Sequence, residues 1–324
     1  MVQRVKVDFV VELRERAQFL LQTHFSPAGR YGTAFHLTSP FSDLRTLALD
    51  SFGVRELASP DFSLLSDFER GQILELLDGS DPYLLWYLAH ADKLPVQVLV
   101  VPAGQTMDLE LNGSLVTFVF LQAEAKLNLI HNVLNESLGI SRLFVWQSEA
   151  SSLSSWGLRA GNSFLSERVE VYLQGLGASA LVRHLTVGTE KQQADMAVRV
   201  YHQAPQTTSD LVVRTAAAGK HVAVYRGLID IDERGKGSKG YQSGRALLLN
   251  RGAVVDMLPE LAIKTNDVQC SHGVTTTHID EAALFYMRSR GLPVAQARRL
   301  AMTGFFHDML EIPQSLAAQL EQRL

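Results

Sequence analysis

The sequence predicts a mainly β protein with helical regions at both ends of the chain. From about residue 94 the apolar residues alternate with polar ones, beginning with Val96, Val98 and Val100, which is the period of a strand with one buried face. Small polar turns, without helices, separate many short strands. This spacing is typical of a β-sandwich, a β-barrel or a β-solenoid. Two-residue hairpin signals are scarce, Asn112-Gly113 being the main one, and this scarcity favours the solenoid.

The further strands of the β region are identified by residues two apart that share a face. These residues are Met107, Leu109 and Leu111; Val116, Phe118 and Phe120; Leu127, Leu129 and His131; Val169, Val171 and Leu173; Val182 and His184; Met196, Val198 and Val200; Val222 and Val224; Leu261 and Ile263. The β core is therefore assigned to residues 93–277.

An N-terminal helical region is assigned to residues 1–92. Its first helix is indicated by apolar residues at helical spacing, namely Phe9, Val10, Leu13, Ala17, Leu20 and Leu21. A second helical pattern runs from about residue 62 to 91 and is interrupted at Gly79 and Pro82. The turn-rich stretch 26–60 receives no assignment.

A C-terminal helical region is assigned to residues 278–324. Its first helix includes Ile279 and ends at Gly291, with Arg288 and Arg290 in the last turn. Pro293 suits the first turn of the next helix, and a final helix follows Pro313.

The composition excludes several classes of function. A formal net charge of -4 provides no basic surface for a nucleic-acid backbone. One cysteine excludes an internal disulfide framework and fits a reducing, cytoplasmic location. It also excludes a self-sufficient cysteine-ligated cluster, which needs about four thiolates. The apolar runs are too short to cross a membrane, and no secretory signal is expected.

The only cysteine, Cys270, lies two residues before His272 in the segment Asp267-Val-Gln-Cys-Ser-His-Gly273. In an extended segment a thiol and an imidazole two residues apart leave the backbone on the same side. One interpretation is a buried cysteine beside a hydrogen-bonded histidine. The other is an incomplete pair of metal or sulfur ligands.

Three other motifs favour structural roles. The run from His202 to Asp210 ends in small polar residues that make a turn. The segment 234–240 lacks the spacing of a phosphate-binding loop and is expected to be a solvated turn. His131 and His184 each lie on an alternating strand, and no functional role is assigned to either.

Taken together, several segments resemble the SufB/SufD family of iron–sulfur cluster assembly proteins, in order and in spacing. The resemblance covers about the last 125 residues. The matching residues are His202, Pro205, Thr207–Asp210, Tyr225–Ile229, Tyr241, Gln242, Arg245, Leu247–Leu249, Pro259–Ile263, Asp267–Gly273 and Leu284–Gly291.

This resemblance implies a right-handed parallel β-helix flanked by helical regions, acting as a scaffold without catalytic activity of its own. It further implies pairing with a SufB-like scaffold, with self-association as a homodimer left open. A transient iron–sulfur cluster would form at the interface and be shared with the partner chain. A SufC-like ABC ATPase would bind the C-terminal helices, where Phe285, Tyr286, Leu300, Phe305 and Phe306 are the expected docking residues.

Two positions favour similarity to the SufD branch. Gly244 stands where SufB-like chains carry a cysteine, and Ser271 and Gly273 flank His272 where SufB-like chains tend to carry glutamates. In the SufD branch the histidine that matches His272 is the expected metal ligand, and Cys270 is a second candidate. The alternative from another class is a carbohydrate-active β-helix lyase or hydrolase, for which Asp230, Asp232 and Glu233 are the only tight acidic group.

Overall fold

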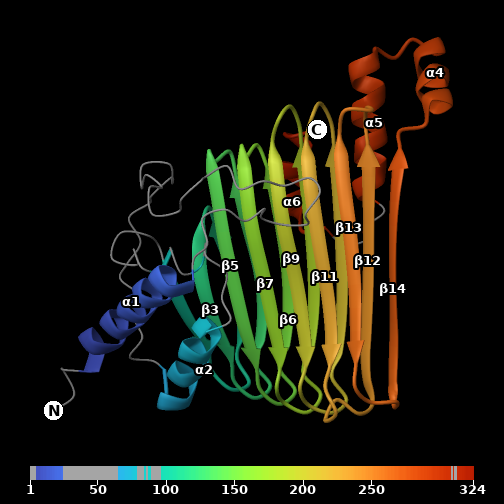
Figure 1. The fold of residues 1–324 in the computed structure, drawn as a ribbon. Coiled ribbons are helices and arrows are strands. Elements are labelled where there is room, and N and C mark those ends of the chain that lie inside the picture. The colour runs from blue at the N-terminus through green and yellow to red at the C-terminus, as the bar shows by residue number, and fades with distance from the viewer. Residues whose placement is uncertain are drawn as a thin grey trace.

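The computed structural model describes residues 5–24, 65–78, 84, 87, 88, 96–307, 309 and 312–324. In this part of the chain the strands form two parallel sheets, each of seven strands, that face each other. Odd-numbered strands make sheet A and even-numbered strands make sheet B, so the chain passes from one sheet to the other at every turn (Figure 1). The architecture is a parallel β-solenoid, and the predicted fold class is confirmed. Sandwich and barrel are excluded.

The strands of each sheet pair in chain order. Sheet A consists of β1 (Val96–Val101), β3 (Leu115–Leu121), β5 (Leu138–Gln147), β7 (Phe164–Leu173), β9 (Gln193–His202), β11 (Val222–Ile231) and β13 (Val254–Ile263). Sheet B consists of β2 (Thr106–Asn112), β4 (Lys126–Leu134), β6 (Ser152–Ala160), β8 (Ser179–Gly188), β10 (Thr208–Ala217), β12 (Ser238–Leu248) and β14 (Val268–His278).

The turns that lead from sheet A to sheet B repeat one backbone feature, a residue in the left-handed region. Six of the described turns have it, at Gly104, Glu124, Ala150, Gly177, Gln206 and Gly237. Each of these amides donates to a carbonyl of the next turn; Glu124 donates to Glu149 at 2.8 Å and Ala150 to Leu176 at 2.8 Å. The hydrogen bonds between stacked turns offset the cost of placing non-glycine residues in this region.

Asn112-Gly113, the main hairpin signal in the sequence, does not form a hairpin. Gly113 has a φ of +94°, as a tight turn requires, but the turn joins β2 of sheet B to β3 of sheet A. The segment 234–240 lies between β11 and β12, as expected for a turn.

The inward face of every strand contributes to a solenoid core that runs the length of the molecule. Leu153, Leu165, Val182 and Val198 are among its members and are 2% exposed or less. Because side chains alternate across a strand, the opposite faces point outward and need separate cover.

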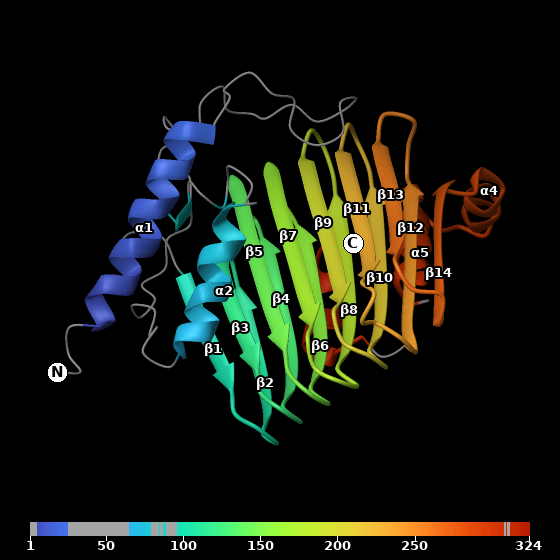
Figure 2. The same cartoon turned by 60° about the horizontal axis from the view of Figure 1, so that its bottom comes forward.

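Helices cover part of each outer face. On sheet A, α2 (Asp67–Asp78) lies over the first strands, and α1 (Val5–His24) lies to the side, beyond β1 (Figure 2). Leu13, Ile73 and Leu77 of these helices belong to one buried cluster with Phe118. The predicted interruption at Gly79 and Pro82, and the side chains of Val10 and Leu21, lie outside the described residues. On sheet B, α5 (Val294–His307) and α6 (Gln314–Glu321) pack on the outward side chains.

The helix α4 (Glu281–Ser289) follows β14 directly. The carboxylate of Asp280 caps it by accepting a hydrogen bond from the amide of Ala282 at 2.9 Å. Figure 1 shows α4 and the start of α5 standing beyond the ends of the strands, next to β14. The strands begin at Val96 and end at His278, compared with the boundaries of 93 and 277 assigned from the sequence.

Candidate functional site

The segment that carries Cys270 and His272 is β14, the terminal strand of sheet B. It pairs on one side with β12, and within the described residues no strand pairs with its other side. In this register Cys270 lies beside Gly240 and His272 lies beside Gln242. The two residues therefore lie at one end of the solenoid, where the stack of strands stops.

Cys270 and His272 share the face of β14 that continues the solenoid core. Cys270 is half-buried and packs against that core, whereas His272 is exposed. A Cβ at Gly240 would make only an ordinary contact with the Cys270 sulfur, at 3.5 Å, but it would lie 2.9 Å from Cγ2 of Ile229. Burial raises the pKa of the Cys270 thiol, although a hydrogen bond with the Gly240 backbone lowers it in part. The two side chains sit side by side, as the spacing predicted.

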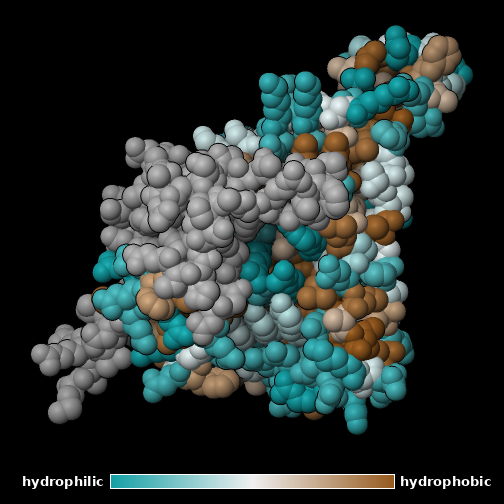
Figure 3. Space-filling view, in the orientation of Figure 1, coloured by the Kyte–Doolittle hydropathy of each residue, from teal (hydrophilic) through white to brown (hydrophobic). Residues whose placement is uncertain are grey.

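The surroundings of this pair are apolar and uncovered. Ile263 on β13 is 41% exposed and Val274 on β14 is 38% exposed. The 11 residues of β14 contain no lysine, arginine, aspartate, glutamate or proline. Edge strands in soluble proteins usually carry such residues, because they prevent pairing with another chain. Figure 3 shows apolar side chains gathered at this end of the molecule.

The C-terminal helices present a second apolar surface. Phe285 and Tyr286 on α4 are 71% and 58% exposed, and Leu300 on α5 is 54% exposed. Phe305 is partly buried against the helices that cover sheet B. Phe306 is completely buried there, so its side chain cannot contact a partner and the expectation for this residue was wrong. The period of α5 turns Phe306 toward sheet B.

The three other histidines considered in the sequence analysis, His131, His184 and His202, lie inside the solenoid. His202 has both ring nitrogens bonded, to Thr207 at 2.7 Å and to Ser209 at 2.8 Å, and burial lowers its pKa to about 4. It is therefore neutral and fully satisfied at neutral pH. The segment 202–210 contains a turn between β9 and β10, as predicted, and the hydrogen bonds of His202 stabilise this turn.

His131 and His184 belong to a buried ionic cluster that the sequence reading missed. Arg159 on β6 pairs with Glu167 on β7, and both side chains are at most 1% exposed. His184 Nδ1 lies 3.4 Å from the second carboxylate oxygen of Glu167, and Arg159 donates to the His131 carbonyl. The pKa of His131 is lowered to about 3, mainly by burial and secondly by the positive charge of Arg159. We refer to these four residues as the interior cluster.

Gly157 makes the interior cluster possible. A Cβ at this position would lie 2.2 Å from Nη1 of Arg159 and 2.5 Å from the carbonyl of His131, so only glycine leaves space for the guanidinium. The sequence did contain a signal: Glu167 has the same phase as the core residues Leu165 and Val169. A charge on that phase must be paired.

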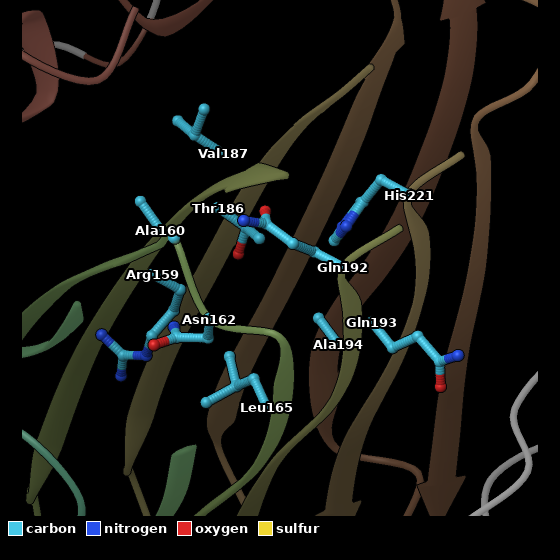
Figure 4. A pocket seen from close by; sticks show the side chains of 11 residues that line it. Arg159, Ala160, Asn162, Leu165, Thr186, Val187, Gln192, Gln193, Ala194 and His221 are labelled. Carbon is cyan, nitrogen blue, oxygen red and sulfur yellow. The ribbon is translucent and has the colours of Figure 1, made fainter. Parts of the chain in front are cut away.

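Three hollows of different size lie in the described surface. Figure 4 shows the smallest, of about 10 Å³, which has room for about one water molecule beside Thr186 and His221. A hollow of about 480 Å³ contains Asp108 and Glu110. Asp108 accepts a hydrogen bond from Asn128 at 2.7 Å, and Glu110 is bonded to Asn112 and Gln319.

A third hollow, of about 430 Å³, lies between α2 and the outer face of sheet A. Its buried carboxylate, Glu170, accepts a hydrogen bond from Tyr172 at 2.5 Å and pairs with Arg168 and Arg199 at 2.6 and 3.4 Å. Glu170 is therefore held by three donors, and the second acid that lines this hollow is the exposed Glu75 on α2.

Two of the three acidic residues considered for a carbohydrate-active enzyme are ion-paired. Asp230 lies 3.4 Å from the Lys264 ammonium, and Asp232 lies 2.7 Å from the Arg234 guanidinium. The described residues contain no group of three or more histidine, cysteine or acidic side chains arranged to hold a metal ion. In the described part of the chain no helix is long and apolar enough to span a membrane.

The fold and the terminal strand together define a class of protein: a parallel β-solenoid whose last strand exposes a histidine beside a cysteine. Residues 103–305 match the family model described as "SUF system FeS cluster assembly, SufBD core domain". The chain belongs to this family, and the resemblance inferred from the sequence is confirmed.

Three relatives illustrate the similarity. The iron-sulfur cluster assembly protein SufD of Escherichia coli is 27% identical over 183 residues, which are 55% of this chain and 43% of the relative. Two SufBD family proteins of Mycobacterium bovis are 28% identical over 178 residues and 29% identical over 206 residues. These cover 54% and 55% of this chain, and 21% and 52% of the relatives. The chain thus spans about half or less of these relatives' lengths.

Proposed function

We propose that this chain is a SufD-like scaffold that helps to build an iron–sulfur cluster at an interface with a second scaffold chain. The observation that carries the proposal is the exposed His272 beside the half-buried Cys270 on an unprotected terminal strand. The cluster is the cargo of the assembly. The scaffold itself needs no catalytic residue, and the single free thiol suits a reducing cytoplasm.

The ligand count supports a cluster shared between chains. Such clusters are held by about four protein ligands, whereas the neighbouring pair Cys270 and His272 offers one imidazole and one thiol. The missing ligands would come from a partner. Iron displaces the thiol proton when it binds, so the raised pKa of Cys270 weakens this ligand without excluding it.

The partner is expected to pair with β14. The free edge of an 11-residue strand presents unpaired amides and carbonyls, and a strand from another chain satisfies them. Ile263 and Val274 supply apolar contacts on either side of this edge. A SufB-like scaffold is the expected partner, and a second copy of this chain is the alternative.

A SufC-like ABC ATPase is the expected partner of the C-terminal helices. Phe285, Tyr286 and Leu300 form the proposed docking surface, with Phe305 at its margin. Exposed apolar patches of this kind, on helices that stand away from the core, are typical of interaction sites. Movement of these helices would be transmitted directly to β14, which α4 follows in the chain.

The site is tested by His272→Ala in the complex co-purified with its partner scaffold. We expect the variant to fold and to associate, but to lose nearly all cluster formed with Fe²⁺ and sulfide, measured by visible absorbance. His278→Ala is the matched control, because His278 is an exposed histidine on the same strand and face. An unchanged cluster yield in His272→Ala would remove this residue from the ligand set.

The docking surface is tested by Phe285→Ser. Loss of a central exposed aromatic typically weakens an interface by 2 kcal/mol or more, roughly a 30-fold change in affinity for the ATPase. Phe68→Ser is the control, because Phe68 is 73% exposed but lies on α2. Equal ATPase binding by the Phe285 variant and the control, measured by calorimetry, would place the docking surface elsewhere.

A further inference from the structure

Gln242, the neighbour of His272 on β12, is buried although it lies one strand from the open end. Its side chain is on the core face and is 4% exposed, and the backbone register places it directly beside His272. Neighbouring residues on adjacent parallel strands have side chains about 5 Å apart on the same face. The amide of Gln242 and the ring of His272 are therefore within reach of each other.

One end of the Gln242 amide is anchored. Its nitrogen donates a hydrogen bond to the hydroxyl of Tyr225 on β11, at 3.2 Å, across the solenoid core. Tyr225 is completely buried, and burial raises its pKa, so the phenol stays neutral. The anchor fixes the direction of the amide in a part of the core that is otherwise apolar.

The chain leaves space for this anchor at Gly227. A Cβ there would lie 1.7 Å from the Gln242 amide nitrogen and 2.5 Å from the Tyr225 hydroxyl. Any other residue would displace the pair. Gly227 therefore provides the space in which Gln242 and Tyr225 form a hydrogen bond between the two sheets.

The other end of the amide has no partner. The carbonyl oxygen Oε1 of Gln242 is buried and accepts no hydrogen bond from any described residue. A buried acceptor without a donor costs about 1–3 kcal/mol, so a hydrogen bond to this atom would stabilise the protein. The donor group in register with it on the next strand is the imidazole of His272.

We propose that Gln242 is a positioning residue for His272. Its Oε1 accepts a hydrogen bond from one ring N–H, and the other ring nitrogen then keeps its lone pair toward the subunit interface. A neutral imidazole has one donor and one acceptor nitrogen, and an acceptor beside the ring decides which is which. Ligand histidines are commonly oriented in this way by a second group. The inference rests on the proposed role of His272 as a ligand.

The first test needs no metal. Long-range ¹H–¹⁵N spectra of the full chain, labelled at histidine and recorded where the ring is neutral, report the tautomer of His272 directly. His272→Ala identifies its signals. We expect one dominant tautomer in the unsubstituted chain and a mixed, water-like distribution in Gln242→Leu. A mixed distribution in the unsubstituted chain, the same as that of His278, would overturn the proposal.

Two further variants separate orientation from folding. Gln242→Glu keeps an acceptor oxygen at the same place, and we expect it to restore the dominant tautomer. The double variant Tyr225→Phe with Gln242→Leu removes both members of the bridge and leaves no buried hydroxyl unpaired, so it should fold and still show the mixed distribution. A dominant tautomer retained in this double variant would contradict the proposed role of Gln242.

The second test concerns the metal and distinguishes this proposal from the proposed function. Anaerobic Fe²⁺ titration of the co-purified complex should show binding weakened about 10–100-fold in Gln242→Leu and restored in Gln242→Glu. Undiminished binding in Gln242→Leu, with binding lost in His272→Ala, would reject Gln242 and keep the ligand. Undiminished binding in His272→Ala would reject the ligand role itself, while the tautomer measurement would still decide whether Gln242 orients the ring.

Discussion

The interior cluster and the end of β14 both place histidines on the core face of strands, but their surroundings differ. In the interior cluster Arg159 and Glu167 neutralise each other, and His184 lies against the same carboxylate. At the end of β14, His272 is exposed beside Cys270 and no further strand follows among the described residues. A histidine on the inward face is thus buried in an ionic cluster within the stack of strands, whereas at the end of the stack it is exposed and can reach a ligand. The comparison predicts that substitutions inside affect stability and that substitutions at the end affect assembly.

The largest expected effect is that of Glu167→Gln on stability. It leaves the buried Arg159 charge without its counter-ion, and breaking a buried pair in this way costs about 3–5 kcal/mol. Urea denaturation followed by circular dichroism measures the change. His272→Ala in the same assay is expected to change the free energy of unfolding by no more than about 0.5 kcal/mol, as for other surface sites. Equal effects of the two variants would remove the distinction between the regions.

The second effect concerns pH and His221. Burial lowers the pKa of His221 from 6.5 to about 4. As the pH falls from about 6.5 to about 4, the unfolded chain takes up this proton and the folded chain does not, so stability is lost. His131 and His202 also lower the stability as the pH falls, because their pKa values in the folded chain are about 3 and about 4.

His221→Leu tests this assignment, because neither ring nitrogen of His221 has a hydrogen-bond partner among the described residues. The variant lacks the ring that takes up a proton only in the unfolded chain. Its stability should therefore depend on pH less steeply, by up to about 1.4 kcal/mol per pH unit over this range. Denaturation midpoints measured from pH 7 to pH 4 give the slope. An unchanged slope would show that the ring is already protonated, or solvated, inside the solenoid.

Ile263→Glu is expected to have the smallest effect on the stability of the isolated chain. It is expected to weaken assembly with the partner scaffold. A charge in the apolar margin of the open end should weaken association with the partner scaffold about tenfold or more, equivalent to about 1.4 kcal/mol. Leu176→Glu is the control, because Leu176 is 46% exposed but lies in the turn between β7 and β8. Analytical ultracentrifugation of the mixed chains compares them. Equal weakening by both would indicate a general charge effect.

Much of the fold could be predicted because it depends on local patterns. The twofold alternation of Val169, Val171 and Leu173 is the pattern of a strand with one buried face, and Pro293 precedes the observed start of α5 at Val294. The left-handed turns at Glu124 and Ala150 could not be predicted, because hydrogen bonds from neighbouring turns stabilise them. Such contacts exist only when the strands are stacked.

The candidate site also has features that the sequence predicts and features that it does not. The shared face of Cys270 and His272 follows from their spacing, and the structure places them together. The burial of Phe306 and the bond between Gln242 and Tyr225 depend on which elements pack together, and a periodic pattern alone does not specify this. The proposed role of the open end involves a partner, and the described residues show only the uncovered edge of β14.

The most direct test of the central claim is the detection of a histidine nitrogen bound to the cluster. Only this chain is labelled with ¹⁵N-histidine, the complex is reconstituted with Fe²⁺ and sulfide, and pulsed electron paramagnetic resonance is recorded on the reduced cluster. The account predicts a ¹⁵N hyperfine coupling that is absent in His272→Ala and present in His278→Ala. A cluster formed in full yield without any ¹⁵N coupling would contradict it.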